Sequence, residues 1–399
     1  MRSLIHALRS GHWPALIGAW LHFEVSFMVW LLIGALGVFI AGEFGLTATQ
    51  KGLLVGVPLL GGAVLRIVVG LASDTIGPKS IGLALLLCEL VAVLWGWLGA
   101  TSYHQILGVG LCLGTAGASF AVALPLASRA YPPAHQGLAM GVAASANSGT
   151  VLAAFFAPRL GQIVGWHGVF GLMVFPILLT IILFSVLVPG EIGRTPSARP
   201  RSGPILRLPS LYWLSFLYAV TFGGFVGFCS FLPIFFHDQY GLHLVTAGSL
   251  TALCGLAGSL IRPAGGYVAD RLGGVHVLLV VFLVMAGCVL AIARLPAVAW
   301  AAPMIVTAVA AMGFGNGVVF QVVADRLRPQ IGVATGVIGA AGGFGGFLLP
   351  VWLGMLKDAT GSYQGGFLLF AAVALTASLS VAVAIWRRGR RDAGAGLIH

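Results

Sequence analysis

The chain consists of long apolar stretches separated by short polar segments. A helix that crosses a membrane needs about 20 predominantly apolar residues, and stretches of that length recur from Trp13 to Trp386 without a polar block of domain size. The pattern predicts twelve transmembrane helices, over residues 14–41, 50–72, 79–99, 104–128, 135–161, 167–189, 209–236, 245–269, 275–295, 300–323, 331–354 and 363–386. We therefore expect an all-α protein embedded in the lipid bilayer, without a soluble catalytic domain.

One polar segment divides the predicted helices six and six. Residues 191–210 read EIGRTPSARPRSGPILRLPS and are rich in Pro, Ser and Arg, a composition typical of a linker. The sequence therefore predicts an N-terminal six-helix bundle over residues 1–190, a cytoplasmic linker over 191–208 and a C-terminal six-helix bundle over 209–399.

The composition agrees with a membrane protein and excludes several classes of site. Only 8% of the residues are charged, against about 25% in soluble domains, and the 58 glycines are typical of membrane helices that approach closely. The five cysteines lie in apolar stretches without a CxxC pair, which predicts no disulfide and no metal site. Because there is also no GxxxxGK[ST] motif and no plausible nucleophile–base–acid set, we expect neither a cofactor nor an enzyme.

The basic residues indicate how the chain is oriented. Fifteen of the 21 Lys and Arg residues fall on the side of the predicted bundle that carries both termini, four fall on the other side, and Arg66 and Arg262 lie within helices. Because cytoplasmic loops carry an excess of Lys and Arg, we expect both termini in the cytoplasm. The net charge of +11 is then a topology signal, and its scatter over short loops argues against nucleic-acid binding. The N-terminus lacks a small-residue cleavage site, so we do not interpret it as a removable signal.

The two halves of the chain repeat one another. The second predicted helix contains Arg66, Gly70 and Asp74, and the eighth contains Arg, Gly and Asp at the same spacing, 196 residues further on. Two more helix pairs share motifs, GVAASANSG from Gly141 with GVIGAAGGFGG from Gly336, and GASF ending at Phe120 with GVVF ending at Phe320. Internal repeats of this kind are typical of secondary transporters, whose halves rock about a central site.

Arg66 and Arg262 are the main candidates for that site. Each stands eight residues before an aspartate at the predicted cytoplasmic rim, which at 1.5 Å per residue is about 12 Å, close to the middle of a hydrocarbon core about 30 Å thick. An arginine at that depth costs at least about 2.5–3.5 kcal/mol, so a compensating role is expected. The alternative is a structural pairing with a buried carboxylate or a helix carbonyl, but only Glu24 and Glu89 lie within the apolar helices.

Two fixed cations at the centre favour a small anion as the substrate. Arginine stays charged, and its planar fork matches a planar oxyanion through paired hydrogen bonds. Two such forks from opposite halves could clamp one anion between them.

Loop motifs and helix motifs together carry a family resemblance. The segments GLASDTIGPK and GGYVADRLGG resemble the G-x-x-x-D-(R)-x-G motif of the major facilitator superfamily. The second copy, with Asp270 and Arg271, is intact, whereas Thr75 replaces the usual arginine after Asp74 in the first copy. Segments of six helices resemble the nitrate/nitrite porter family of that superfamily, namely GTAGASF (114–120), GVAASANSG (141–149), YAVTFGGFVGF (218–228), Arg262, GFGNGVVFQ (313–321) and GVIGAAGGFGGFLLP (336–350).

The resemblance implies a role for particular residues. It implies that Arg66 and Arg262 hold nitrate or nitrite and that Asn147 belongs to the substrate site. It also implies that three aromatic residues sandwich the planar anion, namely Phe120, Tyr218 and Phe222. The glycine runs on the fifth and eleventh helices are candidate gating elements with Asp74, Asp270 and Arg271, and plain helix packing is the alternative for their glycines Gly141, Gly149, Gly336 and Gly343.

Glu24 is the candidate for proton coupling. It lies deep within the first predicted helix, and intramembrane carboxylates in transporters often relay protons. A permanent ion pair with Arg66, or a polar contact with His22 or Ser26, is the alternative. Glu89 on the third helix is a second candidate.

The predicted function is import of nitrate, and of nitrite as a further substrate, by alternating access with proton symport. The resemblance also leaves open a nitrate/nitrite antiporter and, more distantly, a phosphate/organophosphate antiporter. A sensor or channel is disfavoured, because the sequence contains neither a signalling domain nor a symmetric pore motif. We expect a monomer in the cytoplasmic (inner) membrane of a bacterium.

Overall fold

The computed structural model describes residues 10–132, 135–190, 192, 205–327 and 331–395, and the secondary-structure elements within these ranges are helices joined by short loops. The N-terminal part contains α2 (Trp13–Trp30), α3 (Leu32–Ala35), α4 (Gly37–Phe44), α5 (Ala48–Ile76), α6 (Pro78–Leu98), α7 (Tyr103–Gly117), α8 (Phe120–Arg129), α9 (Gln136–Ser145), η2 (Ala146–Ser148) and α10 (Gly149–Leu187). A short η3 (Ile205–Arg207) precedes α11 (Pro209–Tyr240), α12 (Leu244–Leu272), α13 (Gly274–Ala293), α14 (Val298–Arg326), α15 (Ile331–Thr360) and α16 (Gln364–Ala395).

These elements form the predicted twelve-helix membrane fold. Ten helical stretches of the described chain are long and apolar enough to cross a membrane. One of them, Gln136–Leu187, bends at Gly165, because a residue with a φ of 71° cannot continue a right-handed helix. This stretch therefore crosses the membrane twice. The first crossing is divided among α2, α3 and α4 by the non-helical residues Leu31 and Leu36.

Several helices depart from their predicted bounds. The first and fourth predicted helices are interrupted, at Leu31 and Leu36 and at the junction of α7 and α8. The second and eighth run a few residues further than 72 and 269, to Ile76 and Leu272. Each then ends at a glycine, Gly77 with φ 106° or Gly273 with φ 84°, because this conformation is accessible to glycine at little cost and stops a right-handed helix.

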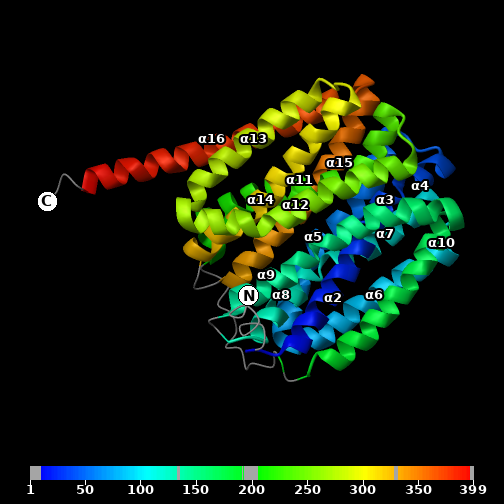
Figure 1. The fold of residues 1–399 in the computed structure, drawn as a ribbon, viewed down its shortest axis with the longest axis horizontal. Helices are drawn as coiled ribbons and strands as arrows, with labels where there is room; N and C mark the ends of the chain where they lie inside the picture. Colours follow the sequence, from blue (N-terminus) through cyan, green and yellow to red (C-terminus); the bar gives the residue numbers. More distant parts are fainter. Residues whose placement is uncertain (1–9, 133–134, 191, 193–204, 328–330, 396–399) are drawn as a thin grey trace.

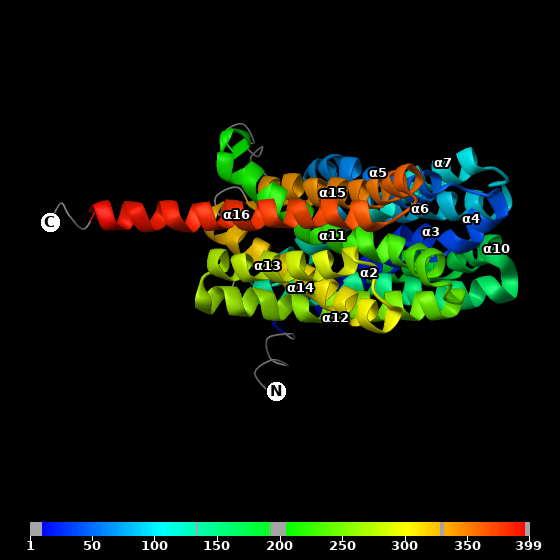
Figure 2. The same cartoon turned by 90° about the horizontal axis from the view of Figure 1, so that it is seen from above.

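The helices of the first and second halves lie on different sides of the molecule. Figure 1 shows the blue to teal helices along one side and the green to red helices along the other, with α16 projecting beyond the bundle, and Figure 2 shows the same bundle from above. The two sides meet mainly where α5 packs against α15 and where α10 packs against α12. Residues 191 and 193–204 of the predicted linker lie outside the described residues, and its end contains η3.

Candidate functional site

Arg66 lies at the centre of the bundle and is almost completely enclosed. Its side chain is 1% exposed. Its Nε donates to the backbone oxygen of Gly117 at 2.8 Å, and Nη1 donates to that of Gly339 at 2.8 Å. The remaining nitrogen, Nη2, is buried without a hydrogen-bond partner. The predicted alternative of carbonyl pairing therefore applies to part of this guanidinium group, and one donor is left over.

Arg262 faces the same region from α12. Its Nη1 is also buried without a hydrogen-bond partner. The two guanidinium groups lie close enough for their charges to act on one another, and the Tyr218 side chain lies within range of both. Among the described residues the only salt bridge joins Lys51 to Asp238, so no described carboxylate compensates either central arginine.

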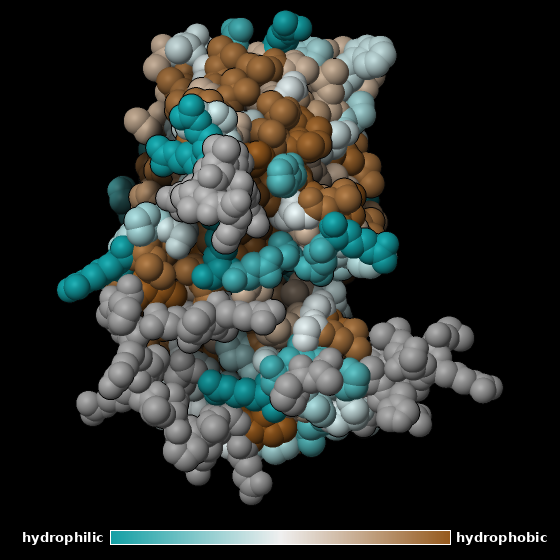
Figure 3. All heavy atoms as spheres, turned by 90° about the vertical axis from the view of Figure 1, so that its left-hand side faces the viewer, coloured by the Kyte–Doolittle hydropathy of each residue, from teal (hydrophilic) through white to brown (hydrophobic). Residues whose placement is uncertain are grey.

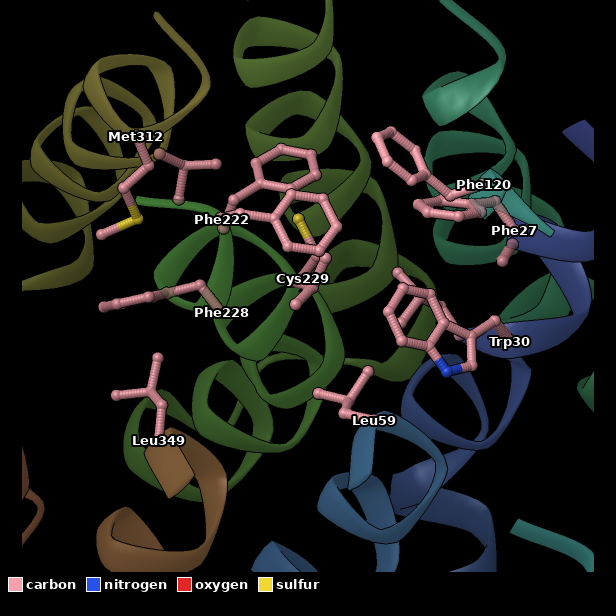
Figure 4. Packing of buried hydrophobic residues seen from close by; sticks show 14 of the residues in the cluster. Phe27, Trp30, Leu59, Phe120, Phe222, Phe228, Cys229, Met312 and Leu349 are labelled. Carbon is pink, nitrogen blue, oxygen red and sulfur yellow. The ribbon is translucent and has the colours of Figure 1, made fainter. Parts of the chain in front are cut away.

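Aromatic faces enclose the Arg66 guanidinium. Its Cζ lies 5.1 Å from the ring centroid of Trp30, 5.6 Å from that of Phe120 and 4.9 Å from that of Phe222. Such contacts hold a cation without neutralising it, because they use the ring quadrupole alone. Figure 4 shows Trp30 and Phe120 on one side of this space and Phe222 of α11 on the other.

The three predicted aromatic residues come together with a fourth, Phe320. Tyr218 and Phe222 stack at 5.0 Å with an interplanar angle of 5°. Phe320 lies 4.9 Å from Tyr218 and 6.1 Å from Phe120, with Arg262 Cζ 5.9 Å from its ring centroid. Phe320 was not among the predicted site residues, although it matches Phe120 in the internal repeat, and that match is the signal that could have identified it.

Asn147 belongs to a break in the fifth crossing. It lies in the 3-10 turn η2, between α9 and α10. The side chain is buried, and its Oδ1 has no hydrogen-bond partner. An unpaired buried amide is costly, so this position is a candidate ligand site. Among the described contacts, none joins Asn147 to either arginine.

Glu24 makes a contact that the sequence did not predict. Its Oε2 accepts a hydrogen bond of 2.7 Å from the hydroxyl of Ser148, the residue after Asn147. The alternative partners are engaged elsewhere, since Ser26 donates to Glu89 at 2.8 Å and His22 Nε2 lies 3.1 Å from the backbone oxygen of Gly82. Glu24 is thus attached to the turn that carries Asn147.

The packing of α5 against α15 ends at the level of Arg66. On the side toward the N-terminus of α5, a Cβ built on Gly343 would lie 2.9 Å from the Cβ of Ala63, which is tighter than real contacts. Gly70 and Gly336 continue the same two faces about one turn beyond Arg66 and Gly339, yet a Cβ on either would meet nothing within 4 Å. The two helices are therefore in contact on one side of the arginines and apart on the other.

The packing of α10 and its neighbours follows the same division. Gly149 packs against the backbone of Glu24, and a Cβ on Gly248 of α12 would lie 2.6 Å from the backbone oxygen of Ala154. A Cβ on Gly141 would meet nothing within 4 Å, and one on Gly266 only a single backbone oxygen at 3.9 Å. Of the four candidate gating glycines, two are tightly packed and two face open space.

Polar contacts join the two halves at the closed end. Lys51 Nζ lies 2.6 Å from Asp238 Oδ2, which also accepts from the hydroxyl of Tyr363 at 3.2 Å. The Asp358 carboxylate accepts from the first backbone N–H groups of α5, those of Ala48 at 3.0 Å and Thr49 at 2.8 Å. A carboxylate is favourable there because helix N-termini carry unpaired donors and positive dipole charge. We call these contacts the outer latch.

The superfamily motif lies at the opposite end. Asp270 and Arg271 are exposed in the last turn of α12, and Arg271 Cζ lies 4.3 Å from the ring centroid of Tyr267. In the first copy Thr75 donates to the backbone oxygen of Leu71 at 3.2 Å, and the side chain of Asp74 lies outside the described part. Figure 3 faces the end from which α16 projects and shows hydrophilic side chains gathered there.

No group of three metal-ligating side chains occurs within the described residues. The two central arginines instead leave one buried guanidinium nitrogen each without a partner. Two cationic donors of this kind suit an anion.

Known proteins resemble the chain over most of its length. The profile of the Major Facilitator Superfamily matches residues 19–350. The "Probable nitrate/nitrite transporter NarK2" of Mycobacterium tuberculosis (strain ATCC 25618 / H37Rv) is 37% identical over 366 residues, covering 88% of this chain and 91% of the relative. The "Nitrite extrusion protein" of Bacillus subtilis (strain 168) is 31% identical over 367 residues, covering 91% and 92%.

Two solved structures share the fold at low sequence identity. A bacterial homologue of the human lysosomal transporter Spinster, in an inward-facing and occupied conformation, has a TM-score of 0.74 at 18% identity, covering 92% of this chain and 96% of that one. The D-xylose–proton symporter has a TM-score of 0.74 at 16% identity, covering 92% and 97%. The matches extend over both halves of the repeat, and with the sequence relatives they establish that the chain belongs to the nitrate/nitrite porter family of the major facilitator superfamily.

Proposed function

We propose that this protein carries nitrate, and nitrite as a second substrate, across the cytoplasmic membrane by alternating access. The names of its relatives, nitrate/nitrite transporter and nitrite extrusion protein, supply the substrate class. The central arginines and their aromatic neighbours supply a site of matching chemistry. The direction we propose is import, coupled to protons.

One observation carries the proposal, namely that two buried guanidinium nitrogens near the middle of the bundle have no partner. A buried cation without a counter-charge is strongly unfavourable, and here the neighbours of Arg66 are carbonyl oxygens and aromatic faces rather than carboxylates. A small anion between Arg66 Nη2 and Arg262 Nη1 would remove that cost. Its flat faces would lie against Phe120, Tyr218 and Phe222, with Phe320 beside Tyr218.

The separated end of α5 and α15 is the route by which the anion leaves the site. Under the positive-inside rule, the end that carries Asp270, Arg271 and the tail of α16 is cytoplasmic, as are both termini. The conformation is then inward-open, with the outer latch closed. Residues 1–190 and 209–399 act as the two rocking units of a monomer, which meet along α5–α15 and α10–α12.

Glu24 is the proposed proton carrier. Its hydrogen bond to Ser148 attaches it to the turn that carries Asn147, so a change in its charge would act beside the anion site. A carboxylate accepts from Ser148, whereas a protonated carboxyl can donate, and the turn would therefore respond to the proton. No described ion pair fixes Glu24 permanently in its charged form.

Uptake of labelled nitrate into proteoliposomes tests the function. One arm has an inward proton gradient, and the other has internal nitrite without a gradient. We expect saturable uptake that the gradient accelerates, with acidification of the lumen. Absence of saturable nitrate transport in both arms would contradict the proposal.

Exchange of nitrate for nitrite is the second candidate, favoured by the relative named as a nitrite extrusion protein. It predicts acceleration by internal nitrite alone. In that case Glu24 would be a structural partner of Ser148. The phosphate/organophosphate antiporter finds no support in the described contacts of the two arginines, which include no Lys or His side chain.

A further inference from the structure

Asn316 of α14 is a buried amide with no hydrogen-bond partner at either end. Its side chain is 0% exposed, and both Oδ1 and Nδ2 are unpaired. Leaving a buried polar group unsatisfied costs about 1–3 kcal/mol, and here two atoms of one side chain are affected. Such a side chain would be expected to meet a ligand or water that completes its hydrogen bonds.

The neighbours of Asn316 in the chain fix its depth in the bundle. A Cβ built on Gly315 would lie 2.8 Å from Thr221 Cγ2 of α11. One built on Gly317 would collide with the backbone oxygen of Arg262 on α12. Asn316 therefore stands at the level of Arg262 and of the α11 segment that carries Tyr218 and Phe222.

The helix also fixes the direction of its side chain. Residues four apart lie on the same face of a helix, so Asn316 shares a face with Phe320. The Phe320 ring contacts Tyr218 and lies beside the Arg262 guanidinium. Because a Cβ on Gly315 would lie nearest to α11 and one on Gly317 nearest to α12, helix geometry directs the Asn316 side chain between these two helices, on the face that carries Phe320.

The arginines alone leave room for another donor. Arg66 uses Nε and Nη1 on backbone oxygens, so its full fork is not available in this conformation. Of the guanidinium nitrogens of these two arginines, one on Arg66 and one on Arg262 are buried without a partner. A planar anion with two oxygens can be served by these two nitrogens, whereas the third oxygen of nitrate needs a further donor.

We propose that Asn316 donates its Nδ2–H to the third oxygen of nitrate and so sets the preference for nitrate over nitrite. This inference rests on the proposed function and extends its site to α14. Asn316 is then a substrate-binding residue. It distinguishes the three oxygens of nitrate from the two of nitrite, whereas the arginines bind the negative charge that both anions carry.

The test is competition binding on the purified full-length protein in detergent, with labelled nitrate as the probe and unlabelled nitrate or nitrite as competitor. Asn316→Leu keeps the approximate volume and removes the donor. A hydrogen bond to a charged group is worth about 1.5–3 kcal/mol, so we expect nitrate to bind about 10- to 100-fold more weakly and nitrite to change by less than about 3-fold. Ser230→Ala is the control, since it removes a buried polar group that likewise has no partner, the Ser230 hydroxyl, further along α11.

The possible outcomes distinguish the role of Asn316 from the proposed transport function. Loss of the nitrate preference in Asn316→Leu, with normal binding by Ser230→Ala, supports it. An unchanged preference, or an equal loss for both anions, overturns the role of Asn316 and leaves the proposed function standing. If the unaltered protein binds neither anion, both are overturned. Asn316→Asp has the same shape but places a negatively charged acceptor beside the anion, so it should weaken the binding of both nitrate and nitrite. Unchanged binding by this variant would also overturn the inference.

Discussion

Replacing Arg66 by lysine separates charge from geometry in the anion site. The variant keeps one positive charge at the centre of the bundle, so the long-range attraction for an anion is retained. It cannot keep the hydrogen bonds, because Arg66 serves two backbone oxygens, on Gly117 and Gly339, and still has Nη2 free. A lysine ammonium is a compact point charge on a flexible stem and does not reproduce a rigid planar fork.

The size of the effect follows from the bonds at stake. The anion loses one charge-assisted hydrogen bond, worth about 1.5–3 kcal/mol. Arg66→Lys should therefore raise the Kd for nitrate about 10- to 100-fold. The fold should survive, since the ammonium can still reach one of the two carbonyl oxygens and lie against the same aromatic rings.

The assay is equilibrium binding of labelled nitrate to the detergent-solubilised protein, followed by uptake in proteoliposomes. Arg294→Lys is the matched control, because Arg294 is an exposed arginine outside the site and its replacement should change neither quantity. Normal affinity and uptake in both Arg66→Lys and Arg262→Lys would refute the reasoning that the guanidinium forks bind the anion.

Three further variants test the gate, the latch and the coupling. Gly343→Ala adds a Cβ 2.9 Å from that of Ala63 and should slow nitrate uptake at least about 10-fold by holding α5 and α15 apart. The control Gly287→Ala, whose new Cβ meets open space, should transport normally. Equal uptake rates in the two variants would show that close packing of α5 against α15 is dispensable. Asp238→Asn removes the Lys51 ion pair and should increase labelling of a cysteine introduced at the closed end by a membrane-impermeant thiol reagent, with unchanged labelling excluding a latch. Glu24→Gln should abolish acceleration of uptake by a proton gradient while counterflow exchange persists, and loss of both or of neither would contradict a carrier role.

The sequence predicted the membrane crossings and the central residues because both leave strong local patterns. Twenty apolar residues in a row have few stable alternatives to a transmembrane helix. The internal repeat then brought Arg66 and Arg262 to equivalent depths, and the structure has their guanidinium groups within electrostatic range of one another.

Features that depend on bends and cross-helix contacts were not predictable in the same way. The breaks at Leu31 and Leu36 occur in an uninterrupted apolar stretch with no Pro near either residue. Glycines lie close to Leu36, but glycine occurs throughout these helices and so does not mark a break. These breaks lie in the crossing whose Trp30 ring packs against the Arg66 guanidinium. Because the breaks were not predicted, Trp30 was not predicted as a residue of the site. The partner of Glu24 was missed for a related reason, since Ser148 reaches it only because the fifth crossing turns at η2.

The bond from Arg66 to the Gly339 oxygen also links the two halves of the repeat, because Arg66 lies on α5 and Gly339 lies on α15. Any rearrangement that separates these two helices at the level of the arginine must break this bond. The Nη1 donor would then need another acceptor, since an unsatisfied buried donor is costly. The bond therefore couples the position of the Arg66 guanidinium to the relative position of the two halves.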